Sequence, residues 1–234
     1  MTSAHIGAGG FLGVIVLDTR FPRPPGDIGC PQTYVRAGIP ARLLTVPGAS
    51  ARRVVQQQDP ALLGPFIDAA RTLAAQGARL VTTSCGFLAA WQKELQAVVP
   101  VPVITSSLLQ CADLPGPGIV TFDAASVHAT LLLRAGVPDG TPVEGLLPGC
   151  ELQSRILEDD TVLDLARAEQ DVVAAAVRLV SHHPQVQNLV LECTNMPPYR
   201  EAVAKATGRP VHDMETLLLA AWSQVQSSST RRAG

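Results

Sequence analysis

The sequence predicts a parallel α/β fold built from two similar halves. Short runs rich in β-branched residues alternate with longer helical patterns along the chain, as in strand–helix–strand units. The strand runs are apolar throughout, which is typical of parallel sheets buried on both faces. Two segments of the chain also match each other position by position, and such self-similarity indicates an internal repeat.

Eight runs have the length and composition of buried strands. They span residues 12–17, 42–46, 80–83, 101–105, 119–122, 143–146, 189–191 and 210–212. Helical patterns follow most of these runs, over residues 61–75, 87–98, 127–134, 162–180, 197–206 and 215–226. This alternation of strand and helix predicts parallel pairing within each half.

The repeat is clearest when "SCGFLAAWQKELQAVVPVPVIT" is laid beside "ECTNMPPYREAVAKATGRPVHD". Without a gap, the matched pairs are Cys85 with Cys193, Trp91 with Tyr199, and Pro102 with Pro210. The run "GVIVLD", which ends at Asp18, likewise matches "GIVTFD", which ends at Asp123. We therefore predict an α/β half over residues 1–114, joined by the C-terminal helix 214–228, and a second half over residues 115–213.

Cys85 and Cys193 are the leading candidates for catalysis. Each follows a predicted strand and begins a predicted helix, where α/β sheets place their sites and unpaired backbone N–H groups favour a thiolate. If the two halves face each other, the thiols approach one cleft from opposite sides. One thiolate could then remove a proton from a carbon atom and the other thiol return one to the opposite face. That chemistry inverts a stereocentre without a cofactor.

Polar groups beside both cysteines could stabilise the enolate-like charge that proton removal creates on a carboxylate. These groups are the side chains of Thr82, Thr83, Ser84, Thr194 and Asn195 and the backbone N–H of Gly86. The sequence therefore predicts a carboxylate-binding environment around the two thiols.

Several other residues at strand ends have two interpretations each. Asp18 and Asp123 could hold a substrate amino group or affect thiol ionisation, or could cap turns. Thr121 and Ser126, on either side of Asp123, could donate to a carboxylate. Ser106 or its neighbour Ser107 could reach the ligand, although one of them is expected to cap the next helix.

The loop over residues 21–32 is rich in proline and glycine and is a candidate lid over the cleft. Arg20 and Arg23 flank its start and could attract a substrate carboxylate, or could be solvated. His212 follows a predicted strand and could polarise Cys193, or could be a histidine satisfied at the edge of a sheet.

The overall composition disfavours several classes of partner. The formal net charge is −2 and the sequence has no basic stripe, so we expect no nucleic-acid partner. The apolar run "GFLGVIVL" is too short to span a membrane, and no basic segment precedes it as in a secretion signal. We expect a cytoplasmic protein.

The cysteines and lysines of the sequence disfavour disulfide, zinc and pyridoxal phosphate chemistry. The five cysteines are widely spaced and form no CxxC pair, which favours neither a disulfide framework nor a zinc site. Lys93 and Lys205 are the two lysines of the sequence, and both lie in polar surroundings. A pyridoxal phosphate enzyme needs a shielded lysine, so we expect neither that cofactor nor a metal.

A strand that ends in a cysteine in each half, the second within "ECTN", resembles the pyridoxal-phosphate-independent aspartate/glutamate racemase superfamily. Hydantoin racemases, maleate isomerases and arylmalonate decarboxylases belong to the same superfamily. The stretches "VLDTRFPRPPGDIGCPQTY", "VTFDAAS" and "LECTNMPPY" resemble a subgroup described only as racemase-family proteins. The resemblance covers nearly the whole chain. It implies two four-stranded parallel sheets, an active site between them, Cys85 and Cys193 as catalytic thiols, and a homodimer.

Three positions depart from the pattern of the well-characterised amino-acid racemases. Those enzymes follow the first cysteine with Asn-Thr, whereas Gly86 and Phe87 stand here. Asn195 stands where aspartate and glutamate racemases have a glutamate. An aspartate- or glutamate-like substrate is therefore not expected, and Phe87 indicates a less polar pocket. The decarboxylase branch keeps only the second cysteine, so the presence of Cys85 disfavours simple decarboxylation.

The sequence thus predicts a cofactor-independent racemase or epimerase that acts next to the carboxylate of a small substrate. One alternative is a related isomerase or lyase in which one cysteine attacks covalently. Another is a cysteine–histidine hydrolase that pairs Cys85 with His212 or His128. A third is a binding protein that keeps the fold without catalysis.

Overall fold

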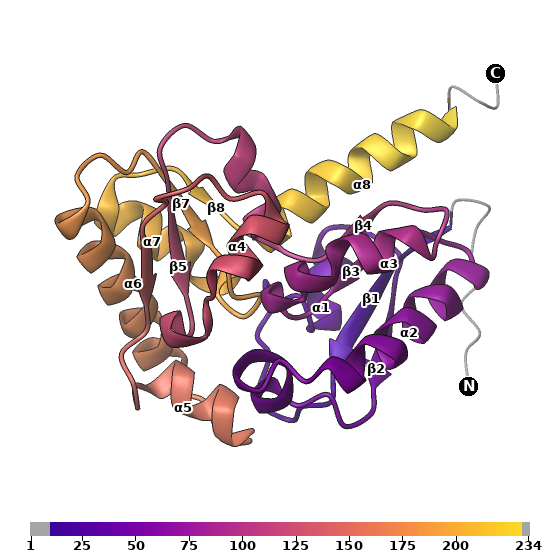
Figure 1. Ribbon diagram of the computed structural model, residues 1–234, viewed down its shortest axis with the longest axis horizontal. Helices are drawn as coiled ribbons and strands as arrows, with labels where there is room; N and C mark the ends of the chain where they lie inside the picture. The colour runs from indigo at the N-terminus through magenta and orange to yellow at the C-terminus, as the bar shows by residue number, and fades with distance from the viewer. Residues whose placement is uncertain (1–9, 231–234) are drawn as a thin grey trace.

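The computed structural model describes residues 10–230 and contains two four-stranded parallel sheets (Figure 1). The first has the order β2-β1-β3-β4, with β1 (Phe11–Leu17), β2 (Ala41–Val46), β3 (Ala78–Thr83) and β4 (Val103–Ile104). The second has the order β6-β5-β7-β8, with β5 (Pro117–Thr121), β6 (Val143–Gly145), β7 (Asn188–Leu191) and β8 (Val211–His212). The predicted fold class, with two sheets of the same topology, is confirmed.

Helices pack around both sheets and connect their strands (Figure 1). The α-helices are α1 (Pro31–Arg36), α2 (Leu63–Ala75), α3 (Gln92–Ala97), α4 (Ala129–Ala135), α5 (Glu151–Glu158), α6 (Leu165–His182), α7 (Arg200–Thr207) and α8 (Met214–Thr230). Short 3-10 segments include Gly86–Trp91, Ser107–Asp113, Ala124–Ser126 and Pro197–Tyr199, and Arg52–Gln56 forms one π-helical turn.

All eight predicted strands are present, and the burial of β1, β5 and β7 is complete, whereas the edge strands β2, β6 and β8 are mostly half-buried. Every residue of β1 is buried, and β1 lies inside its sheet, where Ile15 pairs with both Leu44 of β2 and Thr83 of β3. β5 has the equivalent place in the second sheet, between β6 and β7.

Helix prediction was less complete. α1 and α5 were not predicted, because six- and eight-residue helices are too short to show a clear period. The helix expected from residue 162 begins instead at Leu165, because the Asp164 side chain accepts hydrogen bonds from the N–H groups of Ala166 and Arg167.

Two clusters of apolar side chains form the core. The larger cluster includes residues of both sheets, and the smaller one lies between the first sheet and α8. In the smaller cluster, Leu12 and Leu80 pack with Met214, Leu218 and Trp222. The C-terminal helix thus packs on the first sheet, whereas the division of the chain between residues 114 and 115 stays a prediction.

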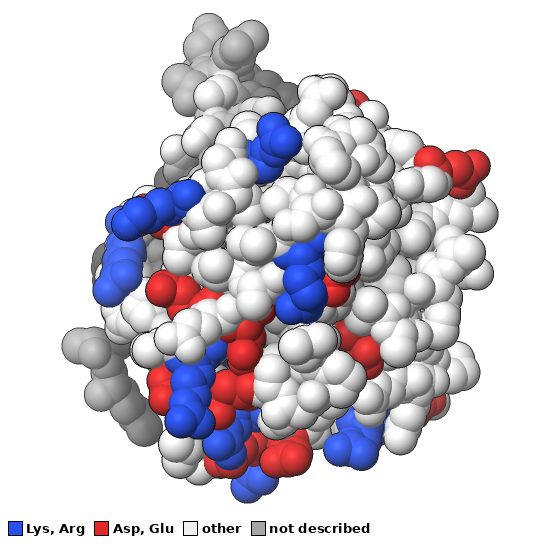
Figure 2. Space-filling model, turned by 90° about the vertical axis from the view of Figure 1, so that its left-hand side faces the viewer, with Lys and Arg blue, Asp and Glu red and all other residues white. Residues whose placement is uncertain are grey.

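Charged side chains are dispersed over the surface. On the face of the molecule shown in Figure 2, basic and acidic groups lie intermingled beside large uncharged areas. Within residues 10–230, no helix is both long enough and apolar enough to cross a membrane.

Candidate active site

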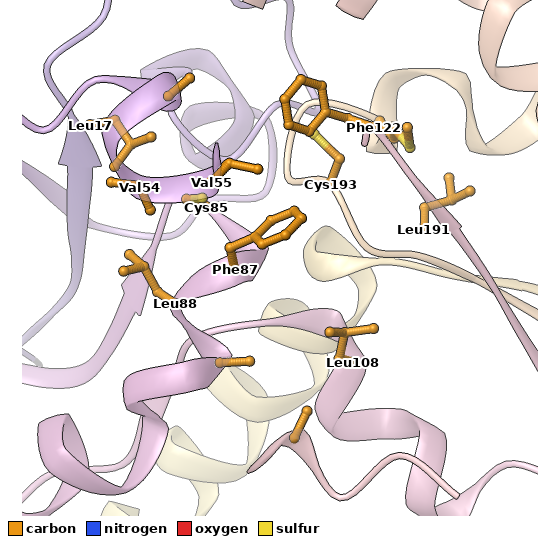
Figure 3. Packing of buried hydrophobic residues seen from close by; sticks show 14 of the residues in the cluster. Leu17, Val54, Val55, Cys85, Phe87, Leu88, Leu108, Phe122, Leu191 and Cys193 are labelled. Atoms are coloured by element: carbon orange, nitrogen blue, oxygen red, sulfur yellow. The ribbon is translucent and has the colours of Figure 1, made fainter. Parts of the chain in front are cut away.

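Cys85 and Cys193 line one small cavity between the two halves, at the carboxyl ends of β1, β3, β5 and β7. The cavity has about 330 Å³ of space not filled by atoms, part of it open to solvent. Figure 3 shows Cys85 and Phe87 of the first half opposite Phe122 and Cys193 of the second. The sequence repeat therefore predicted correctly that the two thiols share one space.

Cys85 is held at the end of β3 by a short series of hydrogen bonds. The Ser84 N–H donates to the Ile15 carbonyl (2.9 Å), and the Leu17 N–H donates to Ser84 Oγ (3.1 Å). Thr83 Oγ1 donates to the Cys85 carbonyl at 3.1 Å. The chain then enters the 3-10 segment that begins at Gly86, which fixes the direction of the thiol.

Cys193 has the equivalent position after β7. Its thiol donates to Asn195 Oδ1 (Sγ···O 3.3 Å), and Asn195 Nδ2 donates to Asp27 Oδ2 at 2.6 Å. Thr194 Oγ1 donates to the Ser84 carbonyl at 2.6 Å. This last bond connects the turn of one cysteine directly to the turn of the other, so the two thiols are positioned as a unit.

Both thiols are buried, and their environment opposes ionisation. Burial, followed by the nearby Glu192 carboxyl, raises the pKa of Cys85 to about 12, although the N–H groups of Phe87 and Leu88 and the Arg23 guanidinium act to lower it. Burial, followed by Glu192, also holds the pKa of Cys193 well above its usual value. The expectation of thiolates favoured by helix N-termini is therefore wrong, because desolvation outweighs the backbone N–H groups.

Glu192 is a site residue that sequence reasoning missed. It precedes Cys193, is 1% exposed and lines the cavity. Its Oε2 accepts a hydrogen bond from Thr121 Oγ1 at 2.8 Å, whereas Oε1 has no partner among the described residues. Burial raises the pKa of Glu192 to about 7. The acidic residue in the apolar run "LVLEC" was the signal in the sequence.

The internal symmetry is broken at Glu192. Ser84 precedes Cys85 and its N–H donates to the first strand of its sheet; the Glu192 N–H makes the matching bond to the Val120 carbonyl at 2.8 Å. Glu192 thus occupies the position of Ser84 in the other half. The repeat therefore places a carboxyl group on one side of the cavity and a hydroxyl group on the other.

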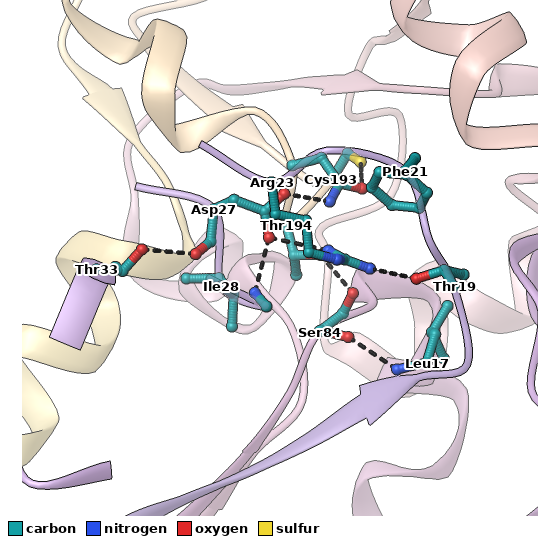
Figure 4. Close-up of polar contacts among 12 residues, drawn as sticks. Leu17, Thr19, Phe21, Arg23, Asp27, Ile28, Thr33, Ser84, Cys193 and Thr194 are labelled. Carbon is teal, nitrogen blue, oxygen red and sulfur yellow. Dashed lines mark hydrogen bonds and ion pairs between the residues drawn. The ribbon is translucent and has the colours of Figure 1, made fainter. Parts of the chain in front are cut away.

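The loop over residues 21–32 reaches the site, and Figure 4 shows its Phe21, Arg23 and Asp27 close to Cys193 and Thr194. Its Phe21 and Arg23 line the cavity, with the Arg23 guanidinium 4.2 Å from the Phe21 ring centre. Arg23 also pairs with Asp27 (2.9 Å) and donates to Thr19 Oγ1 (2.9 Å). The loop therefore contributes directly to the site, and its opening as a lid stays a prediction.

The predicted site residues fall into three groups. Ser84, Gly86, Phe87, Thr194 and Asn195 line the cavity together with both cysteines. Thr121 reaches the cavity through its bond to Glu192. The remaining candidates, Asp18, Thr83, Ser106 and Asp123, are not among the lining residues.

The residues outside the cavity support neighbouring turns. Exposed Asp18 accepts from the Gly48 N–H (2.8 Å). Asp123 caps the segment Ala124–Ser126, and Ser106 Oγ accepts from the Leu108 N–H (3.2 Å). The capping interpretation of these side chains is the one that the structure favours.

No histidine lines the cavity in the part of the chain that is described. His212 Nε2 lies 3.1 Å from Asn188 Oδ1, and burial lowers the pKa of His212. The geometry therefore does not support the cysteine–histidine hydrolase. Arg20, the other candidate near the loop, forms an exposed ion pair with Asp159.

Comparison with solved structures defines the class of protein. A variant of arylmalonate decarboxylase in a sulfate-associated form matches with a TM-score of 0.63 at 18% identity, over 92% of this chain and 93% of that one. A glutamate racemase of Bacillus anthracis matches with a TM-score of 0.60 at 16% identity, over 94% and 82% of the two chains. The chain has the fold of the aspartate/glutamate racemase superfamily, as its motifs predicted.

Comparison of sequences places the chain in one family with this fold. No family model matches the chain. A dimethylsulfoniopropionate lyase of Durusdinium sp. clade D is 30% identical over 216 residues, which cover 86% of this chain and 70% of the relative. Dimethylsulfoniopropionate lyase 5 of Emiliania huxleyi is 28% identical over 229 residues, and the match spans 44% of that longer relative. The chain belongs to the family of the Durusdinium protein.

Proposed function

We propose that this protein is a cofactor-independent lyase that acts on a small carboxylate with a positively charged leaving group on its β-carbon, as in dimethylsulfoniopropionate. The observation that supports this most strongly is the cavity itself, in which two thiols lie among aromatic side chains. The name of the Durusdinium relative supplies the substrate class.

In the proposed reaction a cysteine thiolate removes one proton from the carbon next to the carboxylate. The electron pair of that C–H bond forms the new C=C bond, and the C–S bond breaks with its electrons leaving on sulfur. Dimethylsulfoniopropionate would give dimethyl sulfide, acrylate and one proton, which stays on the thiol until solvent removes it. The step is proton abstraction by a positioned base.

Two aromatic rings of the cavity suit a sulfonium group. Phe87 and Phe122 line the cavity, and aromatic rings attract cations through their faces, whereas the ring of Phe21 already carries the Arg23 guanidinium. A bound cation would also lower the pKa of a nearby thiol, because a positive charge favours the thiolate. The substrate itself would thus offset part of the effect of burial, which raises the pKa of both Cys85 and Cys193.

A racemase or epimerase that uses both thiols is the second candidate. The observation that favours it is the cysteine at the equivalent strand end of each half, since inversion needs a group on each face of the carbon atom. Elimination needs one base only. Both reactions begin with the same proton abstraction, so the fate of the resulting carbanion separates them.

The test is to incubate the protein with dimethylsulfoniopropionate and measure dimethyl sulfide by gas chromatography and acrylate by NMR. A parallel series in D₂O follows deuterium entry at the α-carbon of chiral amino acids, hydantoins and arylated acids. Equal amounts of the two products would support the lyase. Deuterium entry with loss of optical activity, and no dimethyl sulfide, would instead support the racemase and exclude the proposed elimination.

A further inference from the structure

We propose that Glu192, in its protonated form, donates a hydrogen bond from Oε1 to the substrate carboxylate and so stabilises the charge that proton abstraction creates there. This inference rests on the proposed function, because it requires a carboxylate in the cavity. It assigns to Glu192 a binding and catalytic role that complements the two thiols.

The geometry leaves one oxygen of Glu192 free for a ligand. Oε2 is fixed by Thr121 at 2.8 Å, which sets the orientation of the carboxyl group. Oε1 is buried without a partner in the described structure and lies against Gly86, which also lines the cavity. A buried polar atom without a partner is costly, and a ligand that accepts a hydrogen bond would remove that cost.

Some of the groups expected to stabilise the carboxylate already have protein partners. Thr194 Oγ1 donates its one hydrogen to the Ser84 carbonyl, whereas Ser84 Oγ accepts from the Leu17 N–H and keeps its own hydrogen for another acceptor. Asn195 bonds both Cys193 and Asp27. Among the uncharged polar side chains that were predicted to hold the carboxylate, each one that lines the cavity has a protein partner.

Burial favours the protonated form of Glu192, and a bound carboxylate would favour it further. The thiols of Cys85 and Cys193 face it from the ends of β3 and β7, and Thr121 faces it from β5 and acts to lower its pKa. Across the cavity, the loop contributes Arg23, which is paired with Asp27. Burial raises the pKa of Glu192 to about 7, and a second carboxylate would raise it further by like-charge repulsion.

A protonated carboxyl group next to the substrate carboxylate has a clear chemical role. Removal of the α-proton moves negative charge onto the carboxylate oxygens, and a donor held in a fixed position stabilises that charge more than water does. A carboxylic acid that burial keeps neutral is an established way to provide such a donor. Arg23 and the Ser84 hydroxyl also line the cavity and are competing donors. The pH dependence distinguishes Glu192 from both, because neither a guanidinium nor a hydroxyl group changes its protonation in this range.

The test measures binding of acrylate, a product of the proposed reaction, by isothermal titration calorimetry from about pH 6 to about pH 9. In the wild type, the dissociation constant should rise about tenfold per pH unit above about pH 7, and near pH 8 binding should take up close to one proton. In Glu192→Gln, which keeps a hydrogen-bond donor, both effects should vanish. Glu94→Gln is the matched control, because Glu94 also has a buried oxygen without a described partner but lines a different cavity.

The remaining outcomes are decisive. If the wild type binds acrylate without pH dependence, or Glu192→Gln keeps the wild-type dependence, the role of Glu192 is excluded while the lyase proposal stands. If acrylate does not bind the wild type at all, the role of Glu192 is excluded, and dimethyl sulfide release alone then decides the lyase proposal. Infrared difference spectra of the wild type provide a measurement that needs no variant: binding near pH 8 should produce a new band of a protonated carboxyl group, and its absence would exclude the inference.

Discussion

Oε1 of Glu192 lies so close to Gly86 that a β-carbon on residue 86 would be 2.2 Å from this oxygen and 2.4 Å from the Glu192 carbonyl. A glycine directly after Cys85 is therefore required for the carboxyl group to enter the cavity. The same position departs from the Asn-Thr pattern of familiar racemases, and the close approach of Glu192 gives that departure a physical reason.

Gly86→Ala should consequently displace the Glu192 carboxyl group. We expect a loss of stability of about 1–3 kcal/mol, as for other overpacked cores, with a large loss of activity. Gly64→Ala is the control, because Gly64 lies in α2 and a β-carbon at this position would meet only open space; it should be neutral or stabilising. Urea unfolding of both variants measures the difference, and equal stability of the two would contradict the contact.

The pH dependence of stability should reveal Glu192 directly. Its pKa is higher in the folded protein, about 7, than in an unfolded chain. The folded state therefore binds more protons, and its stability falls as pH rises from about 4.5 to about 7, by roughly 3 kcal/mol from this group. Glu192→Gln should lack this fall, which urea unfolding across that range can measure. Parallel curves for the two proteins would show that the carboxyl pKa is not raised.

The pH–rate profile should have a characteristic shape. Below about pH 7, kcat/KM should rise with the thiolate fraction. Above about pH 7 it should level off, because loss of protonated Glu192 offsets the gain in thiolate. In Glu192→Gln the rise should continue through pH 8 without levelling off, since the amide does not titrate and the thiol pKa values lie far above this range. A wild-type profile that keeps rising through pH 8 would remove the need for a protonated carboxyl group.

The aromatic residues should recognise the cation rather than the carboxylate. Phe122→Leu keeps an apolar side chain but loses the ring face, so KM for dimethylsulfoniopropionate should rise about 2- to 30-fold. Acrylate, which has no cationic group, should bind nearly as in the wild type. Phe66→Leu is the control, because Phe66 is buried against Trp91 and is not a lining residue. A matching loss of acrylate affinity in Phe122→Leu would indicate general damage to the cavity instead.

The sequence predicted the fold well because parallel sheets bury their strands on both faces, which leaves continuous apolar runs. It also predicted the shared location of Cys85 and Cys193, because the repeat places equivalent residues at equivalent strand ends. Glu192 was not predicted as a site residue, because the equivalent residue in the other half is Ser84 and comparison of the two halves shows no shared acidic residue there. The pKa values of the two thiols were expected to be lowered and are raised instead. Their burial depends on how the two halves and the loop pack, which the sequence does not show.

The roles of polar residues at strand ends could not be predicted from the sequence, as Thr194 shows. Thr194 was expected to bind substrate, yet its hydroxyl connects the two halves of the site. Asp18 and Asp123 were candidates because they end matched strands, yet both cap nearby backbone groups. A polar residue at a strand end can serve the turn or the ligand, and only the three-dimensional arrangement separates these roles.

The central claim is that a strand-end thiol in this cavity removes the α-proton of a β-sulfonium carboxylate. The most direct measurement is the rate of dimethyl sulfide release by the wild type, Cys85→Ala, Cys193→Ala and the control Cys111→Ala, whose cysteine is buried in the core and does not line the cavity. We predict wild-type release from the control and a loss of about 10²- to 10⁴-fold in at least one of the other two variants. Release at the wild-type rate by both Cys85→Ala and Cys193→Ala would contradict the account.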